Sequence, residues 1–241
     1  MSVRLVVRTL SELCITAGAL IVLFVGYVMF WTGVQAEAAM DGEIRLLQDE
    51  WVAREQPPAE APAQQPGQPS TQPSTKPSAP PPPPYRDGKG IAVMYIPRFG
   101  PEWDWPVLEG TRTGTLKKGL GHYAGTARLG ATGNFAVAGH RRTYGDPFKD
   151  VPKLRRGDAV VLTDGTTWYT YRITGRPYRT VPTDTGVIDP VPRASGFDGP
   201  GRYLTLTTCE PEWGSSHRLI VWAHLDATRP VTSGRPAALN S

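Results

Sequence analysis

Cys209 is the one cysteine outside the apolar N-terminal part of the chain, and its surroundings suit nucleophilic catalysis. It ends the run Tyr203-Leu-Thr-Leu-Thr-Thr-Cys209, which predicts a strand with the thiol on its polar face. A loop of eight residues follows, and Arg218 opens the next apolar run. If the two strands form a hairpin, Cys209 and Arg218 face each other with Cβ atoms about 5 Å apart. A guanidinium there favours a thiolate or an oxyanion, although an inert buried cysteine is the alternative.

A thiol nucleophile needs an acid–base partner, and histidine is the usual one. His140 follows the apolar run 135–139, at a strand-to-loop junction. His122, within residues 119–123, is the second candidate, and spacing alone gives His140 only a modest advantage over it. Solvated or structural roles are expected for the other two histidines, His217 and His224.

The segments that contain and surround these residues have the sequence pattern of strands. Apolar runs are separated by Gly and Pro, Asp164-Gly165 is typical of a hairpin turn, and no amphipathic helix of three turns is evident. Residues 85–230 therefore predict an all-β barrel or sandwich with short helical turns. The expected strands are 91–96, 135–138, 159–162, 168–173, 203–208 and 219–225.

Three segments of the domain resemble the sortase family. Thr205-Leu-Thr-Thr-Cys209 matches the TLxTC signature of sortases, and Arg218 falls where their arginine begins the following strand. Asn134–Arg141 resembles the segment that carries the sortase histidine, and Gly119–Tyr123 resembles the stretch upstream of it. The similarity covers residues 91–226, and the whole chain is most similar to class E sortases of actinobacteria.

This resemblance implies an eight-stranded β-barrel and a cysteine transpeptidase with Cys209, His140 and Arg218 as catalytic residues. Cys209 is expected to attack the Thr–Gly bond of an LAxTG- or LPxTG-like sorting motif in a secreted protein, forming a thioester. An amine of a peptidoglycan precursor then accepts the acyl group. We predict substrate contacts from Thr208, which would shape the oxyanion site, and from Tyr144 and His122.

The N-terminal part of the chain predicts a membrane anchor. Residues 13–36 carry no charge and are long enough to cross a bilayer. Arg4 and Arg8 precede them, so residues 1–12 are expected in the cytoplasm and the domain outside it. A cleaved signal peptide is the alternative, because Ala36-Glu37-Ala38 resembles a cleavage site. Residues 37–56 read as a juxtamembrane helix that continues the anchor.

Composition separates the rest of the chain into a linker, a domain and a tail. Residues 57–84 hold 12 prolines and predict a disordered, extended tether. Residues 231–241 are expected to be a flexible tail. The domain from residue 85 onward has a net charge of +7, but its basic residues are scattered and predict no nucleic-acid partner. The sequence shows no metal-ligand spacing and no cofactor motif.

Two other functions fit parts of these patterns. A pilin-polymerising sortase usually carries a lid before the barrel and a C-terminal membrane helix, and neither is evident here. A non-catalytic, membrane-anchored wall-binding module would leave Cys209 unreactive.

Overall fold

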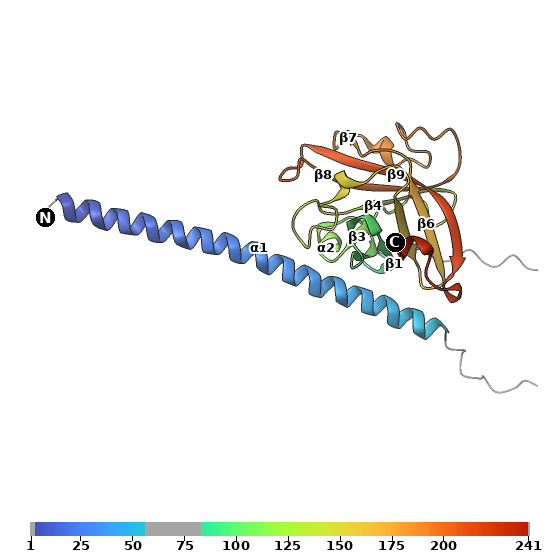
Figure 1. Ribbon diagram of the computed structural model, residues 1–241, viewed down its shortest axis with the longest axis horizontal. Coiled ribbons are helices and arrows are strands. Elements are labelled where there is room, and N and C mark those ends of the chain that lie inside the picture. The colour runs from blue at the N-terminus through green and yellow to red at the C-terminus, as the bar shows by residue number, and fades with distance from the viewer. Residues whose placement is uncertain (1–2, 56–82, 241) are drawn as a thin grey trace, which may run out of the picture.

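A computed structural model describes residues 3–55 and 83–240 of the chain (Figure 1). One long helix, α1 (Val3–Glu55), precedes a β-domain, and the predicted linker lies outside the described residues except for Pro83 and Pro84. The strands are β1 (Gly90–Tyr95), β2 (Asp104–Glu109), β3 (Leu120–His122), β4 (Gly133–Ala138), β5 (Ala159–Thr163), β6 (Thr167–Ile173), β7 (Tyr178–Thr180), β8 (Arg202–Glu210) and β9 (His217–Pro230).

Eight of these strands close into a barrel, as the sequence predicts. They follow the order β6-β5-β1-β2-β3-β4-β8-β9, and the pairing of β9 with β6 closes the ring. β7 pairs with the beginning of β9 outside the ring. Strand β9 is 14 residues long, so it can pair with β8, β6 and β7 along its length.

Inward-facing apolar side chains fill the barrel. Phe135 of β4, Leu204 and Leu206 of β8 and Tyr171 of β6 are at most 1% exposed. Burying a side chain of this size contributes about 1.5–3 kcal/mol. β4 and β8 are neighbouring strands, and β6 is separated from β8 only by β9. Packing among these four residues therefore helps to set the position of β4 relative to β8.

Three of the observed strands are not among those predicted from the sequence. β2 contains Pro106, which argues against a strand, and β3 and β7 have only three residues each and show no pattern. Helical structure in the domain is confined to short turns, as expected. These are the α-helical turn α2 (Thr113–Leu116) and the 3-10 turns Pro97–Phe99, Val151–Lys153, Thr185–Ile188, Val231–Ser233 and Ala237–Leu239.

The hairpin predicted at Asp164-Gly165 joins β5 to β6. The Asp164 Oδ1 atom accepts hydrogen bonds from the amides of Thr166 and Thr167, both at 2.9 Å. Gly165 has a φ of +87°, a conformation that glycine adopts without a steric cost.

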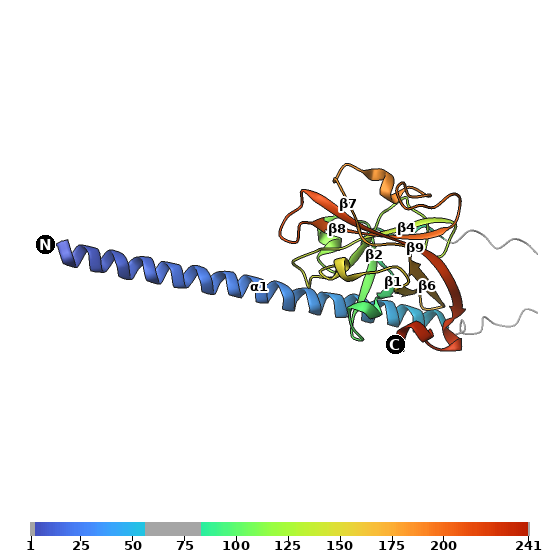
Figure 2. The same ribbon diagram turned by 45° about the horizontal axis from the view of Figure 1, so that its top comes forward.

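Helix α1 is continuous, and the barrel lies beside its C-terminal half (Figures 1 and 2). Its section Val3–Tyr27 is long and apolar enough to cross a membrane, and it overlaps the predicted span 13–36. The predicted juxtamembrane helix from residue 37 is the same helix, running on to Glu55.

The C-terminal residues correct one prediction. Residues 231–240 are not a free tail, because two 3-10 turns fold them back onto the barrel. Val231 and Leu239 pack against the cluster that contains Val161 and Trp168. Apolar residues scattered at this spacing give no periodic pattern, so composition alone suggested flexibility.

Candidate active site

The parallel pairing of β4 with β8 brings His140 beside Cys209. Ala138 is in register with Thr207, and the amide of Gly139 extends the ladder by donating to the Thr207 carbonyl at 3.1 Å. Two residues further along, His140 lies just past the end of β4, and Cys209 is the second-to-last residue of β8, so both lie at the same end of the sheet. Neighbouring strands lie about 4.8 Å apart, so the two side chains belong to one site.

The β8–β9 hairpin puts Arg218 directly opposite Cys209, as the sequence predicts. The Arg218 Nη1 atom donates to the carbonyls of Ser215 and His217 in the connecting loop, at 3.0 and 2.9 Å. Within the described residues, its Nε and Nη2 atoms have no hydrogen-bond partner. One nitrogen of the guanidinium therefore holds the loop, and the other two keep their donors free among the described residues, although the Arg218 side chain does not line the pocket that contains Cys209.

A pocket of about 200 Å³ opens where the two strand ends meet. Cys209 is half-buried in its wall, and the His140 Nε2 atom is buried without a hydrogen-bond partner among the described residues. A buried, unpartnered ring nitrogen costs free energy, which a substrate group can recover by bonding to it. The lining residues are His140, Arg141, Arg142, Thr143, Cys209, Glu212, Trp213 and Gly214.

The surroundings of His140 favour its neutral form. Burial of the ring lowers the pKa of His140, the Asp146 carboxylate opposes this effect, and the Lys117 ammonium adds to it. Tyr144 covers the imidazole with ring centroids 5.1 Å apart, and the Lys117 Nζ atom lies 5.2 Å from the Tyr144 ring centre. Tyr144 is thus placed beside the histidine, but it does not line the pocket.

The loop after His140 is held in an unusual conformation. Thr143, Tyr144 and Asp146 have φ values of 74°, 51° and 54°, in the left-handed region that non-glycine residues rarely adopt. Each such residue costs on the order of 1 kcal/mol. The Phe148 amide closes the loop by donating to the His140 carbonyl at 3.0 Å. The loop thereby keeps Tyr144 against the imidazole.

Two arginines that follow His140 complete the site, and sequence reasoning missed them. Arg141, 7% exposed, donates to the Glu210 carboxylate at 2.7 Å and to the Cys209 carbonyl at 3.4 Å. Arg142 pairs with Glu212 and lies over the Trp213 ring, 4.7 Å from its centre. The signal was available, because two basic residues follow the histidine and two acidic residues follow the cysteine.

Thr208 supports the site from inside the sheet. Its hydroxyl donates to the Gly139 carbonyl at 2.8 Å, and the residue is 3% exposed. The bond ties the residue before Cys209 to the residue before His140. Thr208 is therefore placed to hold the two strand ends together, and its side chain does not line the pocket.

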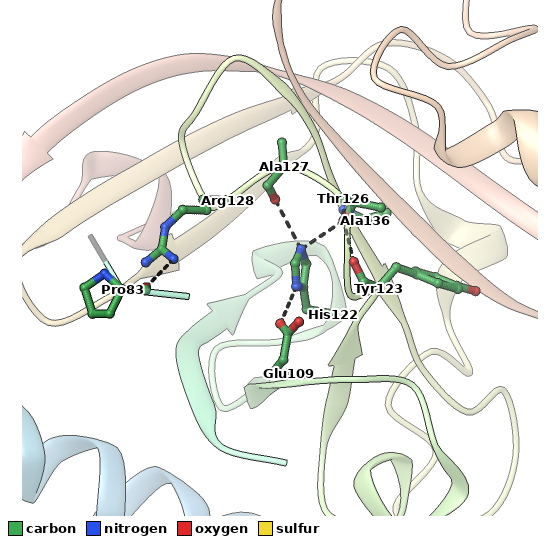
Figure 3. Close-up of polar contacts among 8 residues, drawn as sticks. All are labelled: Pro83, Glu109, His122, Tyr123, Thr126, Ala127, Arg128 and Ala136. Carbon is green, nitrogen blue, oxygen red and sulfur yellow. Dashed lines mark hydrogen bonds and ion pairs between the residues drawn. The ribbon is translucent and has the colours of Figure 1, made fainter. Parts of the chain in front are cut away.

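His122 lies away from the pocket and has partners on both ring nitrogens (Figure 3). Its Nδ1 atom is 2.6 Å from the Glu109 carboxylate, and its Nε2 atom is 2.9 Å from the Thr126 hydroxyl and 3.2 Å from the Ala127 carbonyl. The residue is 2% exposed and stacks on Phe135. The structure does not bring this histidine together with Cys209.

The fold and the site together define a family. Residues 94–226 match the sortase domain family, and the chain belongs to that family, whose members are cysteine transpeptidases. Sortase SrtE1 of Streptomyces coelicolor is 36% identical over 97% of this chain, which spans 61% of that protein's length. Sortase SrtE2 of the same organism is 32% identical over 95% of this chain and 85% of its own length.

Solved structures point to the same class. Sortase E from Streptomyces avermitilis is 74% identical, covers 64% of this chain and 99% of its own, and superposes with a TM-score of 0.61. Sortase E1 from Streptomyces coelicolor, solved with a tripeptide in the active site, is 40% identical, covers 63% of this chain and 97% of its own, and has a TM-score of 0.60. The resemblance to class E sortases is confirmed.

Proposed function

We propose that this chain is a membrane-anchored sortase in which Cys209, His140 and Arg218 carry out the reaction. One observation carries the proposal. The parallel β4–β8 register and the β8–β9 hairpin put His140 and Arg218 at the ends of the two strands that flank Cys209, and Cys209 and His140 both line one pocket. The tripeptide in the active site of sortase E1 supports a peptide as the substrate.

In the first half-reaction, the Cys209 thiolate attacks the carbonyl carbon of Thr in a C-terminal LAxTG- or LPxTG-like motif. Arg218 donates from its uncommitted nitrogens to the oxyanion that forms. The Thr–Gly C–N bond then breaks, and protonated His140 gives its proton to the departing glycine amine. The product is a thioester between Cys209 and the Thr carbonyl carbon.

The second half-reaction reverses these roles. A peptidoglycan precursor amine attacks the thioester, and neutral His140 accepts the proton that the amine loses. The new amide bond forms as the C–S bond breaks, and the thiolate is restored. Among the described residues, His140 and Cys209 make no hydrogen bond to each other, and the buried Nε2 atom of His140 is left for a substrate group.

Anchoring follows from α1. We propose that its apolar section inserts in the membrane with the short N-terminus in the cytoplasm and the barrel outside. Membrane fractionation of a C-terminally tagged chain tests this anchoring. Recovery of mature protein starting near residue 39 in the culture medium would contradict it. Such recovery would instead indicate the cleaved signal peptide.

The catalytic proposal is tested with the full chain in detergent. Incubation with a set of LxxTG peptides and glycine-based amines should give peptide–amine conjugates and a thioester of the enzyme, both read by mass spectrometry. Cys209→Ala should form neither product and remain folded, because losing one half-buried sulfur costs little packing. Equal conversion by the Ala variant would refute Cys209 as the nucleophile, whereas no conversion by the unmodified chain would favour a non-catalytic module.

A further inference from the structure

One face of α1 is packed against the barrel. Ala36 and Leu47 are each 3% exposed, and Met40 packs on the main core. Leu46, the neighbouring residue, is 63% exposed. The three packed positions are four and seven residues apart, as one face of a helix requires.

The barrel surface is shaped to receive this face. A Cβ atom on Gly90 would lie 2.6 Å from the Leu47 Cγ atom, so only glycine leaves room for the leucine. Gly165, in the β5–β6 turn, leaves room for the Trp51 ring in the same way. The Glu43 carboxylate, whose side chain is 14% exposed, pairs with the Lys118 ammonium at 3.1 Å.

The order of these contacts gives the barrel an orientation along α1. Going from the N-terminal end, Ala36 meets the loop that follows His140 near Gly145, Leu47 meets β1, and Trp51 meets the β5–β6 turn. The catalytic histidine loop is therefore the contact nearest to the apolar section of the helix. Figures 1 and 2 show the β8–β9 turn on the same side of the barrel, toward the N-terminal half of α1.

The loop that follows His140 lies close to the membrane along α1. The apolar section Val3–Tyr27 is followed by residues 28–36, which are also uncharged, so Ala36 lies at most nine residues beyond the membrane-spanning part of α1. Nine residues of helix rise about 14 Å. With α1 upright in the bilayer, the histidine loop stands within about that height of the membrane surface.

We propose that the packing of α1 on the barrel holds the catalytic pocket at a fixed, low height above the membrane and facing it. The proposal rests on the proposed function and anchoring. It gives the enzyme a selection that its pocket alone does not supply: an acyl donor whose scissile bond lies close to the bilayer reacts faster than the same donor held further out.

The packing itself is tested on the full chain in phosphatidylcholine–phosphatidylglycerol vesicles. A zero-length carbodiimide cross-linker should join Glu43 to Lys118, and peptide mapping should detect the isopeptide. Leu47→Asp should abolish that product, because it places a carboxylate against β1. Leu46→Asp, the same substitution at the exposed neighbouring position, should leave it. No isopeptide in the unmodified chain, or an equal yield in the Leu47→Asp variant, overturns the proposal.

The height selection is tested with sorting-motif peptides anchored in the same vesicles through proline spacers of about 15 Å or about 60 Å. The unmodified chain and Leu46→Asp should cleave the short-spacer peptide at least about fivefold faster than the long one. Leu47→Asp should lose this preference, and Glu43→Lys should weaken it, with Lys118→Glu restoring it in the double variant. Equal rates on both spacers for the unmodified chain overturn the proposal.

A soluble sorting-motif peptide separates this proposal from the catalytic one. All variants should cleave it at similar rates, which also shows that Leu47→Asp is folded. Failure of every variant on the soluble peptide would refute the catalytic function. Normal cleavage of the soluble peptide together with absent height selection would refute only the role of the α1 packing.

Discussion

Two histidines of one barrel stand in opposite situations. His122 has partners on both ring nitrogens and is almost completely buried between Glu109 and the turn at Thr126. His140 is half-buried in a pocket wall, and its Nε2 atom has no partner among the described residues. A side chain whose hydrogen-bonding capacity is used by the fold is fixed in place, whereas unused capacity at a pocket is available to a substrate. Whether the ring nitrogens have hydrogen-bond partners in the fold therefore distinguishes the structural histidine from the candidate catalytic one.

The largest expected effect is on catalysis, at His140. His140→Ala should lower kcat/KM by about 10²- to 10⁴-fold, because the leaving amine loses its proton donor. The melting temperature should change little, since no hydrogen bond of the His140 ring is lost. Peptide-cleavage kinetics and thermal unfolding measure the two effects. His224, an exposed histidine of β9, provides the control. A similar rate loss in His224→Ala would show that the loss at His140 is not specific to the pocket.

The reverse pattern is expected at His122. His122→Ala leaves the buried Glu109 carboxylate without its partner, which should destabilise the fold by about 3–5 kcal/mol. Denaturant unfolding measures this loss, and the double variant with Glu109→Ala should recover part of it. KM of the folded fraction should stay close to that of the unmodified chain. A raised KM with unchanged stability would show that His122 contacts the substrate, as its sequence position first suggested.

A smaller effect is expected from Arg218→Lys. An ammonium keeps the charge opposite Cys209 but cannot brace the loop carbonyls and reach an oxyanion at once, so kcat/KM should fall by about 10- to 100-fold. Steady-state kinetics across a peptide series gives the value. Turnover close to normal would show that charge alone suffices, and that the geometry of the guanidinium has no role.

The smallest effect concerns pH. Burial lowers the pKa of His140, which disfavours the imidazolium that gives its proton to the leaving amine. Lys117→Gln removes a charge that lowers this pKa, so the acidic limb of the kcat/KM profile should move to higher pH.

Asp146→Asn provides the opposite change at the same ring. It removes a charge that raises the pKa of His140, so the acidic limb should move to lower pH. Asn also tolerates the left-handed backbone of residue 146. Shifts of equal sign in the two variants would show that a group other than His140 controls that limb.

Sequence reasoning reached the strands and site residues that follow local rules. The alternation before Cys209 fixed the face of the thiol, and the length of the next loop predicted the Cys209–Arg218 pairing that β8 and β9 show. The choice between His122 and His140 was beyond those rules, because it depends on the parallel register of β4 with β8, which joins segments far apart in the chain. Arg141 was missed for the same reason, since its partner Glu210 is 69 positions away.

Strand β9 both closes the barrel and carries Arg218 opposite the thiol. It comes after all the other strands in the chain, so a barrel still being synthesised or threaded across a membrane has an open edge and an incomplete site. Catalytic competence and closure are therefore acquired in the same folding event. Interrupted synthesis would leave an inactive chain with its core exposed to proteolysis, instead of a partly folded enzyme with an uncontrolled reactive thiol.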